Sequence, residues 1–252
     1  MGGWSELVNA RTAATWIHSD AGVQLFLLSI TRGQRYIVNI YFKTQLMPDT
    51  WFTADFHLGH ANIIRFCSRP FTTVGEMDQA ILERLNASVK ANDILYFLGD
   101  FCMGGHARVV AYRRRIRCQK IFAVPGNHDK QARKLKEDFL WLDNLAEVSI
   151  HGQPIVLCHY ALRVWNRSNR GSWHLYGHSH GRLPEVPNSL SMDVGVDIHD
   201  FRPWHFDEIK SVMNERTKLR EQWPQGVRAM TCICLFSRGF DRSQAVNRLK
   251  AF

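Results

Sequence analysis

The sequence lacks the features that would place it among membrane, secreted or disulfide-rich proteins. No run of about 18 apolar residues occurs in the 252-residue chain, so we expect no transmembrane helix. The apolar segment 23–30 has no basic region before it and no small-residue cleavage site after it, so we expect no signal peptide. The six cysteines include no Cys-x-x-Cys pair, which argues against a zinc ribbon or a disulfide framework.

The cysteines that are present favour a reduced protein. Cys67, Cys102 and Cys158 lie in apolar surroundings, and we predict that they are core thiols. Cys232 and Cys234 form a weak metal-binding pattern, which is more typical of chance than of a site. With no signal peptide expected, this cysteine usage favours a cytoplasmic location.

The composition is that of an ordinary soluble chain with a basic excess. Hydrophobic residues make up 45% and charged residues 22%, and the length suffices for one α/β domain with a sizeable core. A formal net charge of +9 is typical of nucleic-acid-binding proteins. Residues 214–252 hold eight Lys/Arg against three Asp/Glu, however, whereas residues 47–213 hold twenty against eighteen. The basicity therefore lies mainly outside the centre, and nucleic acid is an unfavoured partner.

Five short apolar runs in the centre of the chain each end in Asp, Asn or His. Runs of this length predict buried strands, and in open α/β sheets ligands gather beyond the carboxyl ends of the strands. Alternation along a strand would place Asp55 and His57 on one face. The side chains that follow the five runs are Asp55 and His57, Asp100, Asn127 with His128 and Asp129, His159, and His178 with His180.

The order of these motifs carries a family resemblance. Asp-x-His, Gly-Asp, Gly-Asn-His-Asp, a lone His and Gly-His-x-His resemble the calcineurin-like metallophosphoesterase superfamily, in particular its small bacterial phosphoesterases. Residues 62–71, 171–178 and 192–197 are similar to these enzymes outside the metal motifs, and the resemblance covers roughly residues 48–213. It implies an α/β sandwich of the metallophosphoesterase type, with two mixed β-sheets packed face to face and helices outside.

The resemblance also implies a dinuclear metal site. One divalent ion would be held by Asp55, His57 and His180, and Asp100 would bridge it to the second. The second ion would be held by Asn127, His159 and His178. Mixed nitrogen and oxygen ligands suit Mn best, with Fe, Zn or Ni as further candidates.

The implied reaction is phosphoester hydrolysis by a metal-bridging hydroxide. His128 would be the general acid, and Asp129 would orient it through a hydrogen bond. His60 would contact phosphate or support a ligand. Three arginines between two ligand motifs would clamp phosphate or lie in a solvated loop: Arg163, Arg167 and Arg170.

The substrate is expected to be a small phosphoester, with phosphodiesters preferred. A phosphomonoesterase, a non-catalytic scaffold of the same fold and a nucleic-acid-binding protein are the alternatives. A Ser/Thr protein phosphatase is disfavoured, because Gly99-Asp100 is not followed by an Asp-Arg-Gly continuation and Asp129 stands where those enzymes have Glu. The sequence does not predict the oligomeric state.

The motifs divide the chain into three parts. Residues 1–46 show no clear strand or helix period and are expected to be an N-terminal extension, such as a misassigned start codon would add to the native chain. Residues 47–213 are expected to form the phosphoesterase domain, and residues 214–252 a basic, weakly packed tail. Within the domain we predict helices over 76–90, 106–118 and 130–139, a hairpin turning at 151–153, a strand over 191–196 and a closing segment over 206–212. The basic run 113–117 is predicted to be a solvated helix face.

Overall fold

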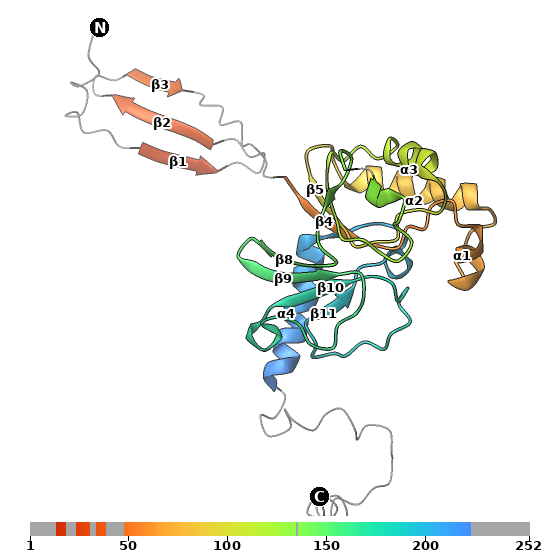
Figure 1. Ribbon diagram of the computed structural model, residues 1–252. Helices are drawn as coiled ribbons and strands as arrows, with labels where there is room; N and C mark the ends of the chain where they lie inside the picture. The colour runs from red at the N-terminus through yellow and green to blue at the C-terminus, as the bar shows by residue number, and fades with distance from the viewer. Residues whose placement is uncertain (1–13, 19–23, 31–33, 39–47, 135, 223–252) are drawn as a thin grey trace, which may run out of the picture. The chain divides into compact units, whose positions relative to one another are not determined.

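The structure is a computed structural model that describes residues 14–18, 24–30, 34–38, 48–134 and 136–222. The chain divides into two compact units, residues 1–47 and 48–252. In the first unit three antiparallel strands pair in the order β1-β2-β3: β1 is Ala14–His18, β2 is Gln24–Ile30 and β3 is Gln34–Val38 (Figure 1). The sequence shows no clear strand period in residues 1–46, and these three strands are structure that the sequence analysis did not predict. Strands of five to seven residues are too short to show a clear period, and only their pairing defines them.

The second unit contains a five-stranded sheet in the order β12-β4-β5-β6-β7. The four strands from β4 to β7 are parallel, and β12 runs antiparallel to β4 at the edge. Three of the predicted apolar runs form its centre. The strands are β4 (Thr50–Thr53), β5 (Ile94–Phe97), β6 (Lys120–Ala123), β7 (Leu140–Trp141) and β12 (Trp204–His205).

A four-stranded sheet in the order β11-β10-β9-β8 completes the sandwich (Figure 1). β8 (Leu145–Ile150) and β9 (Gln153–Cys158) form the predicted hairpin, and β10 (Trp173–Tyr176) and β11 (Ser191–Asp193) run parallel to β9. The two-residue turn of His151 (φ 49°) and Gly152 (φ 81°) has the positive φ angles that short hairpins require. Both sheets are mixed, which confirms the predicted α/β sandwich.

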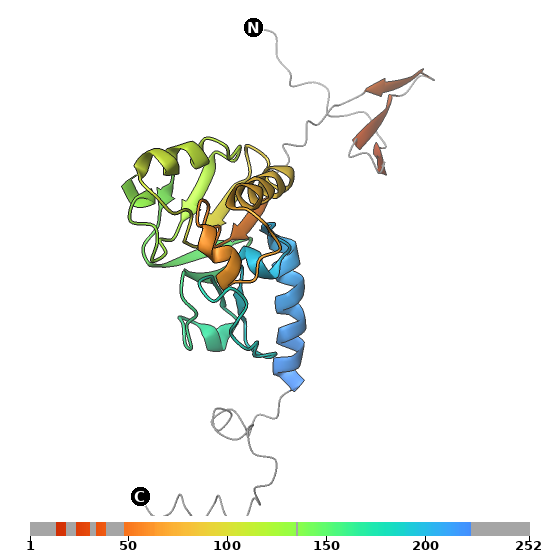
Figure 2. The same ribbon diagram turned by 90° about the vertical axis from the view of Figure 1, so that its right-hand side faces the viewer.

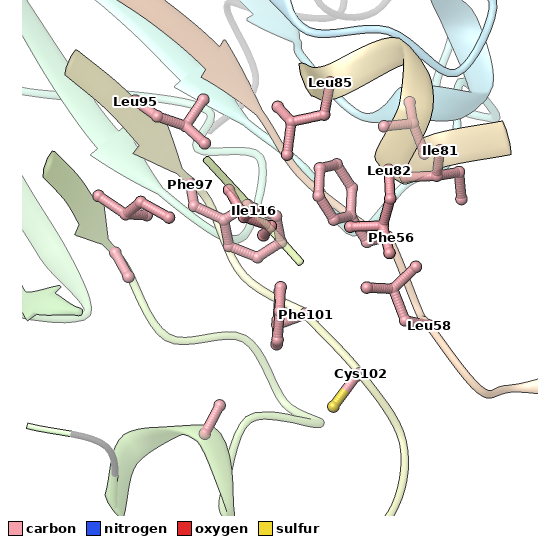
Figure 3. Packing of buried hydrophobic residues seen from close by; sticks show 14 of the residues in the cluster. Phe56, Leu58, Ile81, Leu82, Leu85, Leu95, Phe97, Phe101, Cys102 and Ile116 are labelled. Carbon is pink, nitrogen blue, oxygen red and sulfur yellow. The ribbon is translucent and has the colours of Figure 1, made fainter. Parts of the chain in front are cut away.

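Helices cover the five-stranded sheet and one side of the sandwich. α2 begins at the cap residue Thr73, whose hydroxyl accepts a hydrogen bond from the Glu76 amide, and the predicted helix there is confirmed. Its apolar face, with Ile81 and Leu85, packs against β5 and the loops that follow β4 and β5 (Figure 3). The helices are α1 (Ala61–Phe66), α2 (Val74–Ser88), α3 (His106–Arg113) and α4 (Phe206–Gln222), with short 3-10 turns η1 (Ala132–Lys134), η2 (Ser168–Arg170) and η3 (Val196–Ile198).

The five-stranded sheet is buried on both faces. Along β5, Leu95 and Phe97 point into the cluster that includes α2 and α3, whereas Tyr96 packs against the second cluster. That second cluster joins Phe52 of β4 with Leu157 of β9, among others, and therefore fills the space between the two sheets. Burial on both faces explains why these strands are continuous apolar runs in the sequence.

The charged segment 130–139 is not the predicted helix. Among the described residues of this segment, only the three of η1 are helical. Phe139 is buried at 2% exposure, and its ring centroid lies 5.3 Å from that of Phe101. Likewise α3 ends at Arg113, whose buried guanidinium donates to the Asp138 carbonyl and stacks over Phe139. Residue 113 therefore belongs to the core. Arg114, Arg115 and Arg117 are exposed as predicted, but they follow the end of the helix and do not form a helix face.

The last helix crosses the expected end of the domain. α4 continues to Gln222 along one side of the unit, past the expected boundary at residue 213 (Figure 2). Arg216 is buried, donates to the carbonyls of Ser189 and Ser191, and pairs with Glu185 at 2.8 Å. Residues 214–222 are therefore packed structure, a correction to the predicted weakly packed tail. Cys232, Cys234 and the rest of that tail lie outside the described residues. None of the helices in the described ranges has the length and apolar character needed to cross a bilayer.

Candidate metal centre

The predicted ligands all follow the carboxyl ends of strands that lie side by side. β4, β5 and β6 are neighbours in one sheet, and β9 and β10 in the other. Beyond the strands, the loops after β4 and β5 stay in register, because the amides of Asp55 and His57 donate to the carbonyls of Gly99 and Asp100 at 2.9 Å. Five segments that are distant in the sequence thus converge on one site.

The backbone at these ligands is left-handed rather than extended. β4 ends at Thr53, and Asp55 and His57 have φ angles of 61° and 52°, so the prediction that they share a strand face is wrong. The same conformation occurs at Asp100 (61°), His178 (67°) and His180 (49°). Positive φ is uncommon outside glycine, although Asp and His adopt it more readily than most residues, and such backbone gathers at functional sites.

The first group of ligand atoms contains Asp55, His57 and His180, which lie within 4.8 Å of one another. Asp55 is fully buried, and its Oδ2 accepts the amide of His178 at 2.8 Å, while its Oδ1 has no partner. Both ring nitrogens of His57 are also buried without a partner among the described residues. Buried polar atoms are rarely left unpaired, so Asp55 Oδ1 and one of the two His57 nitrogens fit as ligands of a divalent cation.

The second group contains Asp100, His159 and His178. The Nδ1 of His159 lies 2.7 Å from the carbonyl oxygen of Leu98 and donates to it, which leaves a lone pair on Nε2. That nitrogen lies 3.1 Å from the Asn127 Oδ1 and 3.4 Å from the Asp100 Oδ2. These three atoms need a proton or a cation between them. Burial opposes a proton on His159, but the Asp100 carboxylate outweighs burial and raises the pKa of His159; the same atoms also suit a metal ion.

Asp100 lies between the two groups. Its Oδ2 is 3.5 Å from the His57 Nε2 and 3.4 Å from the His159 Nε2, and each histidine belongs to a different group. Its Oδ1 accepts the amide of His128 at 2.8 Å. One carboxylate oxygen therefore faces both candidate metal positions.

The electrostatics of the buried side chains agree with a cation site. Burial raises the pKa of Asp55 to about 7 and lowers the pKa of His57 to about 3. Burial also opposes ionisation of Asp100, but the adjacent imidazoles of His159 and His57 hold its pKa at about 2. His57 is thus a neutral ligand, and Asp55 gains from a nearby positive charge.

Close approach of the loops requires glycine at two positions. A Cβ at Gly126 would lie 2.2 Å from the Asp100 Oδ1, and one at Gly99 would lie 2.5 Å from the His159 Nδ1. Gly99 also has a φ of 93°. The Gly-Asp and Gly-Asn-His motifs therefore contain glycine because the ligands pack directly on the neighbouring backbone.

The two predicted catalytic residues lie in different environments. His128 is exposed, and its ring centroid is 5.3 Å from that of His57, at the open side of the site. Asp129 is buried, and its carboxylate accepts the amides of Asp100 (2.7 Å), Phe101 (2.9 Å) and Gly126 (2.8 Å). The prediction that Asp129 orients His128 is wrong, because its oxygens already hold the loops after β5 and β6 together.

Only one of the residues predicted to contact substrate is shown to lie close to the site histidines. His60 precedes α1, and its ring lies 5.7 Å from that of His57 and 6.2 Å from that of His128. The three arginines of the predicted clamp are exposed in the loop between β9 and β10. Within the part of the chain that the structure describes, they form no ion pair: Arg163, Arg167 and Arg170.

Three supporting residues were missed by the sequence analysis. Arg69 and Asp197 form a buried ion pair beside His180, and Asp193 accepts the Ser179 hydroxyl and the Gly181 amide, which fixes the last histidine loop. Arg69 and Asp197 lie within segments 62–71 and 192–197, which carry the family resemblance without an assigned role. The family resemblance of these two segments, which lie outside the metal motifs, was the signal by which the supporting residues could have been found.

Comparison with known proteins finds relatives that match about two thirds of this chain. The chain is 28% identical to an uncharacterized protein of Methanocaldococcus jannaschii over 180 residues, which covers 69% of this chain and 96% of that protein. It is 25% identical to the gene 66 protein of Mycobacterium phage D29 over 201 residues, covering 67% and 98% of the two chains. A solved protein of unknown function from Aquifex aeolicus superposes with a TM-score of 0.52 at 23% identity, over 66% of this chain and all of that one.

The family model for calcineurin-like phosphoesterases matches residues 49–205, a span that contains every candidate ligand described above. The match covers β4 through β12 and therefore both sheets of the sandwich. These metal-dependent enzymes hydrolyse phosphoesters, and the residues that converge here suit a metal ion. The chain belongs to the calcineurin-like phosphoesterase family.

Proposed function

We propose that this chain is a dinuclear metallophosphoesterase that hydrolyses phosphodiesters. The position of Asp100 carries the proposal, since its Oδ2 lies within 3.5 Å of an imidazole nitrogen from each of the two ligand groups. A carboxylate in that position would partly neutralise two neighbouring cations that otherwise repel each other strongly. A site for a single ion would not need both groups.

The ligand roles follow from the two groups. Asp55, His57 and His180 would hold one ion, and Asn127, His159 and His178 the other, with Asp100 shared between them. Imidazole, carboxylate and amide ligands suit Mn, with Fe, Zn or Ni as alternatives. Two bound cations would polarise the phosphoryl oxygens and lower the pKa of a water at the site, which then serves as the nucleophile.

His128 is the proposed general acid. Its exposed ring lies next to His57 and is free of the Asp129 carboxylate, so it can reach the oxygen of a leaving alcohol. Its ligand atom also lies within 4.8 Å of those of His57 and Asp100. A ligand role is therefore the competing assignment, and metal content in a variant distinguishes the two.

Two exposed aromatic side chains beside the site support a phosphodiester as the substrate. A diester carries an organic group on both ester oxygens, and exposed aromatic rings stand beside two of the site histidines. Tyr160 is 46% exposed with its ring 4.7 Å from that of His178, and Phe66 is 52% exposed with its ring 6.3 Å from that of His60. These rings offer apolar contact to two separate substituents.

The phosphomonoesterase alternative rests on the arginine loop. A monoester dianion depends on cationic groups around three phosphoryl oxygens. Exposed arginines without an ion pair in the described ranges could supply such a clamp, and three stand in the loop between His159 and His178: Arg163, Arg167 and Arg170. Their distance from the metal positions decides which substrate is preferred.

One comparison of substrates tests the proposal. We expect the specificity constant for bis-p-nitrophenyl phosphate, measured with saturating Mn, to equal or exceed that for p-nitrophenyl phosphate. A preference for the monoester of more than about tenfold, or 1.4 kcal/mol, would favour the phosphomonoesterase. Absence of hydrolysis of either ester, in protein shown to contain metal, would favour the scaffold alternative.

A further inference from the structure

The guanidinium of Arg69 uses all of its hydrogen-bonding capacity inside the protein. Its side chain is completely buried, and five contacts occupy its five N–H groups. Nε and Nη2 donate to the two oxygens of Asp197 at 2.7 and 2.8 Å, and Nη2 donates to the Asp55 carbonyl at 2.7 Å. Nη1 donates to the Phe56 carbonyl at 2.9 Å and contacts the Met77 sulfur at 3.3 Å. A lysine could not reproduce this planar, multidentate arrangement.

Asp197 connects Arg69 to His180, a candidate ligand. Its Oδ2, which already accepts from Arg69, also accepts from the His180 Nδ1 at 2.7 Å. With the proton of His180 on Nδ1, the lone pair of the imidazole lies on Nε2, the nitrogen that remains for a metal. A carboxylate that fixes the tautomer and ring direction of a ligating histidine typically changes metal affinity by about 10- to 100-fold.

The same guanidinium also fixes the loop that contains the other ligands of this group. The carbonyls of Asp55 and Phe56 belong to the two successive peptide units that link Asp55 to His57. Arg69 binds both carbonyls and so sets the direction of this loop. Arg69 thus contacts Asp55 directly, His180 through Asp197, and the carbonyl of the residue before His57. No hydrogen bond in the described residues joins Arg69 or Asp197 directly to Asp100, His159 or His178; the links to that second group are indirect, through the Asp55 Oδ2, which accepts the His178 amide, and the His57 amide, which donates to the Asp100 carbonyl.

We propose that Arg69 and Asp197 are positioning residues for one of the two metal ions only. They set the geometry of the group formed by Asp55, His57 and His180 and leave the other group unaffected. The inference rests on the proposed dinuclear function, because selectivity has meaning only where two ions bind. A buried ion pair that served stability alone would have no preference between the two positions.

The test is the stoichiometry and affinity of Mn(II) in variants of the full chain. We expect equilibrium dialysis with elemental analysis to give two Mn per wild-type chain. Asp197→Asn, which keeps the side-chain shape, should retain one Mn with wild-type affinity and bind the second about 10- to 100-fold more weakly. The electron paramagnetic resonance spectrum should change accordingly from that of a coupled pair to that of an isolated Mn(II) ion.

A matched control separates this role from general stability. Arg113 is a second buried arginine, and it donates to the carbonyls of Asp138 and Ile116 away from the ligand groups. Arg113→Lys should lower the melting temperature but leave two Mn bound with unchanged affinity. Equal weakening of both ions in Asp197→Asn, or two ions with unchanged affinity, would overturn the proposal.

Two further outcomes are informative. If the wild type binds only one Mn, the dinuclear function and the selectivity between two ions both fail. Weaker binding of that ion by Asp197→Asn would then leave a positioning role without selectivity, and unchanged binding would overturn the positioning role as well. If Asp197→Asn does not fold, nitrogen NMR of the wild-type imidazoles with Zn(II) replaces it, with His180 assigned through His180→Gln. A proton on Nδ1 of His180 supports the proposal, and a proton on Nε2 overturns it.

Discussion

The two sides of the metal centre differ in how their side chains are held. On the inner side, Asp55, His57, Asp100 and His159 are at most 3% exposed, and neighbouring backbone fixes them. On the outer side, three predicted site residues are exposed: Asn127, His128 and His178. In the proposed function the inner side would set where the cations bind. On the outer side, Asn127 and His178 would complete the second metal position, and His128 would meet the substrate. Substitutions on the two sides should therefore fail in different ways.

Removal of the shared inner ligand should have the largest effect. In Asp100→Ala both metal positions lose a ligand, so we expect the specificity constant to fall by about 10⁴-fold or more and the Mn content to drop below one ion per chain. Elemental analysis and bis-p-nitrophenyl phosphate hydrolysis measure the two effects. Two fully occupied ions in this variant would show that Asp100 does not bridge.

Removal of the His128 side chain, on the outer side, should slow the reaction without loss of bound metal. We expect His128→Ala to lose about 10²- to 10⁴-fold in rate while it retains two Mn, because a general acid acts only on the leaving group. The loss should be smaller for esters with acidic leaving groups, which need less protonation. His159→Ala is the matched inner variant, and it should lose metal. Equal metal loss in both variants would identify His128 as a ligand.

The inner side should also make metal-free stability depend on pH. The folded-state pKa of Asp55 is raised to about 7, so between its ordinary value and 7 the folded chain holds a proton that the unfolded chain has released. The free energy of unfolding should therefore fall as pH rises through this window, by up to about 4 kcal/mol. The pKa of Asp100 is held at about 2, so this group changes the free energy of unfolding in the opposite direction. Its stabilising contribution is lost only as pH falls below the ordinary pKa of an aspartate.

Urea titrations of the metal-free protein at pH 5 and pH 8 measure this dependence. Bound Mn should abolish the decline, because the cation favours the ionised carboxylate. In Asp55→Asn the slope attributed to this group should disappear. A wild-type slope that the substitution leaves unchanged would assign the pH dependence to other groups.

The smallest effect should come from the chain ends. A fragment of residues 48–222 should keep the stability and activity of the full chain. A fragment ending at residue 213 loses the buried Arg216 and its bonds to the Ser189 and Ser191 carbonyls, so we expect it to be about 1–3 kcal/mol less stable. Thermal melts of the two fragments measure the difference. Equal stability would mean that α4 beyond Met213 contributes nothing to the fold.

The candidate ligands could be proposed from the sequence because each follows a buried strand in a short motif. His159 and Asp100 could be found in this way, since the apolar runs before them are local signals. The supporting residues could not, because their partners are distant: Arg69 and Asp197 are separated by 128 positions. Asp129 was assigned to His128 because they are adjacent in the chain, whereas its carboxylate binds amides 28 and 29 positions away. The prediction of a helix over 130–139 was wrong because of distant contacts too, since the burial of Phe139 overrides local helical propensity.

The left-handed backbone at the ligands narrows the replacements that evolution or design can make there. A side chain at positive φ costs roughly 1–2 kcal/mol in most residue types. At Asp55 and Asp100 a change to Glu would therefore lengthen the ligand and also exchange a residue that tolerates this conformation for one that tolerates it less. Variants that adapt the centre to another metal should come from exchanges among Asp, Asn and His. Transfer of the site to another scaffold would have to copy the backbone turns before the side chains.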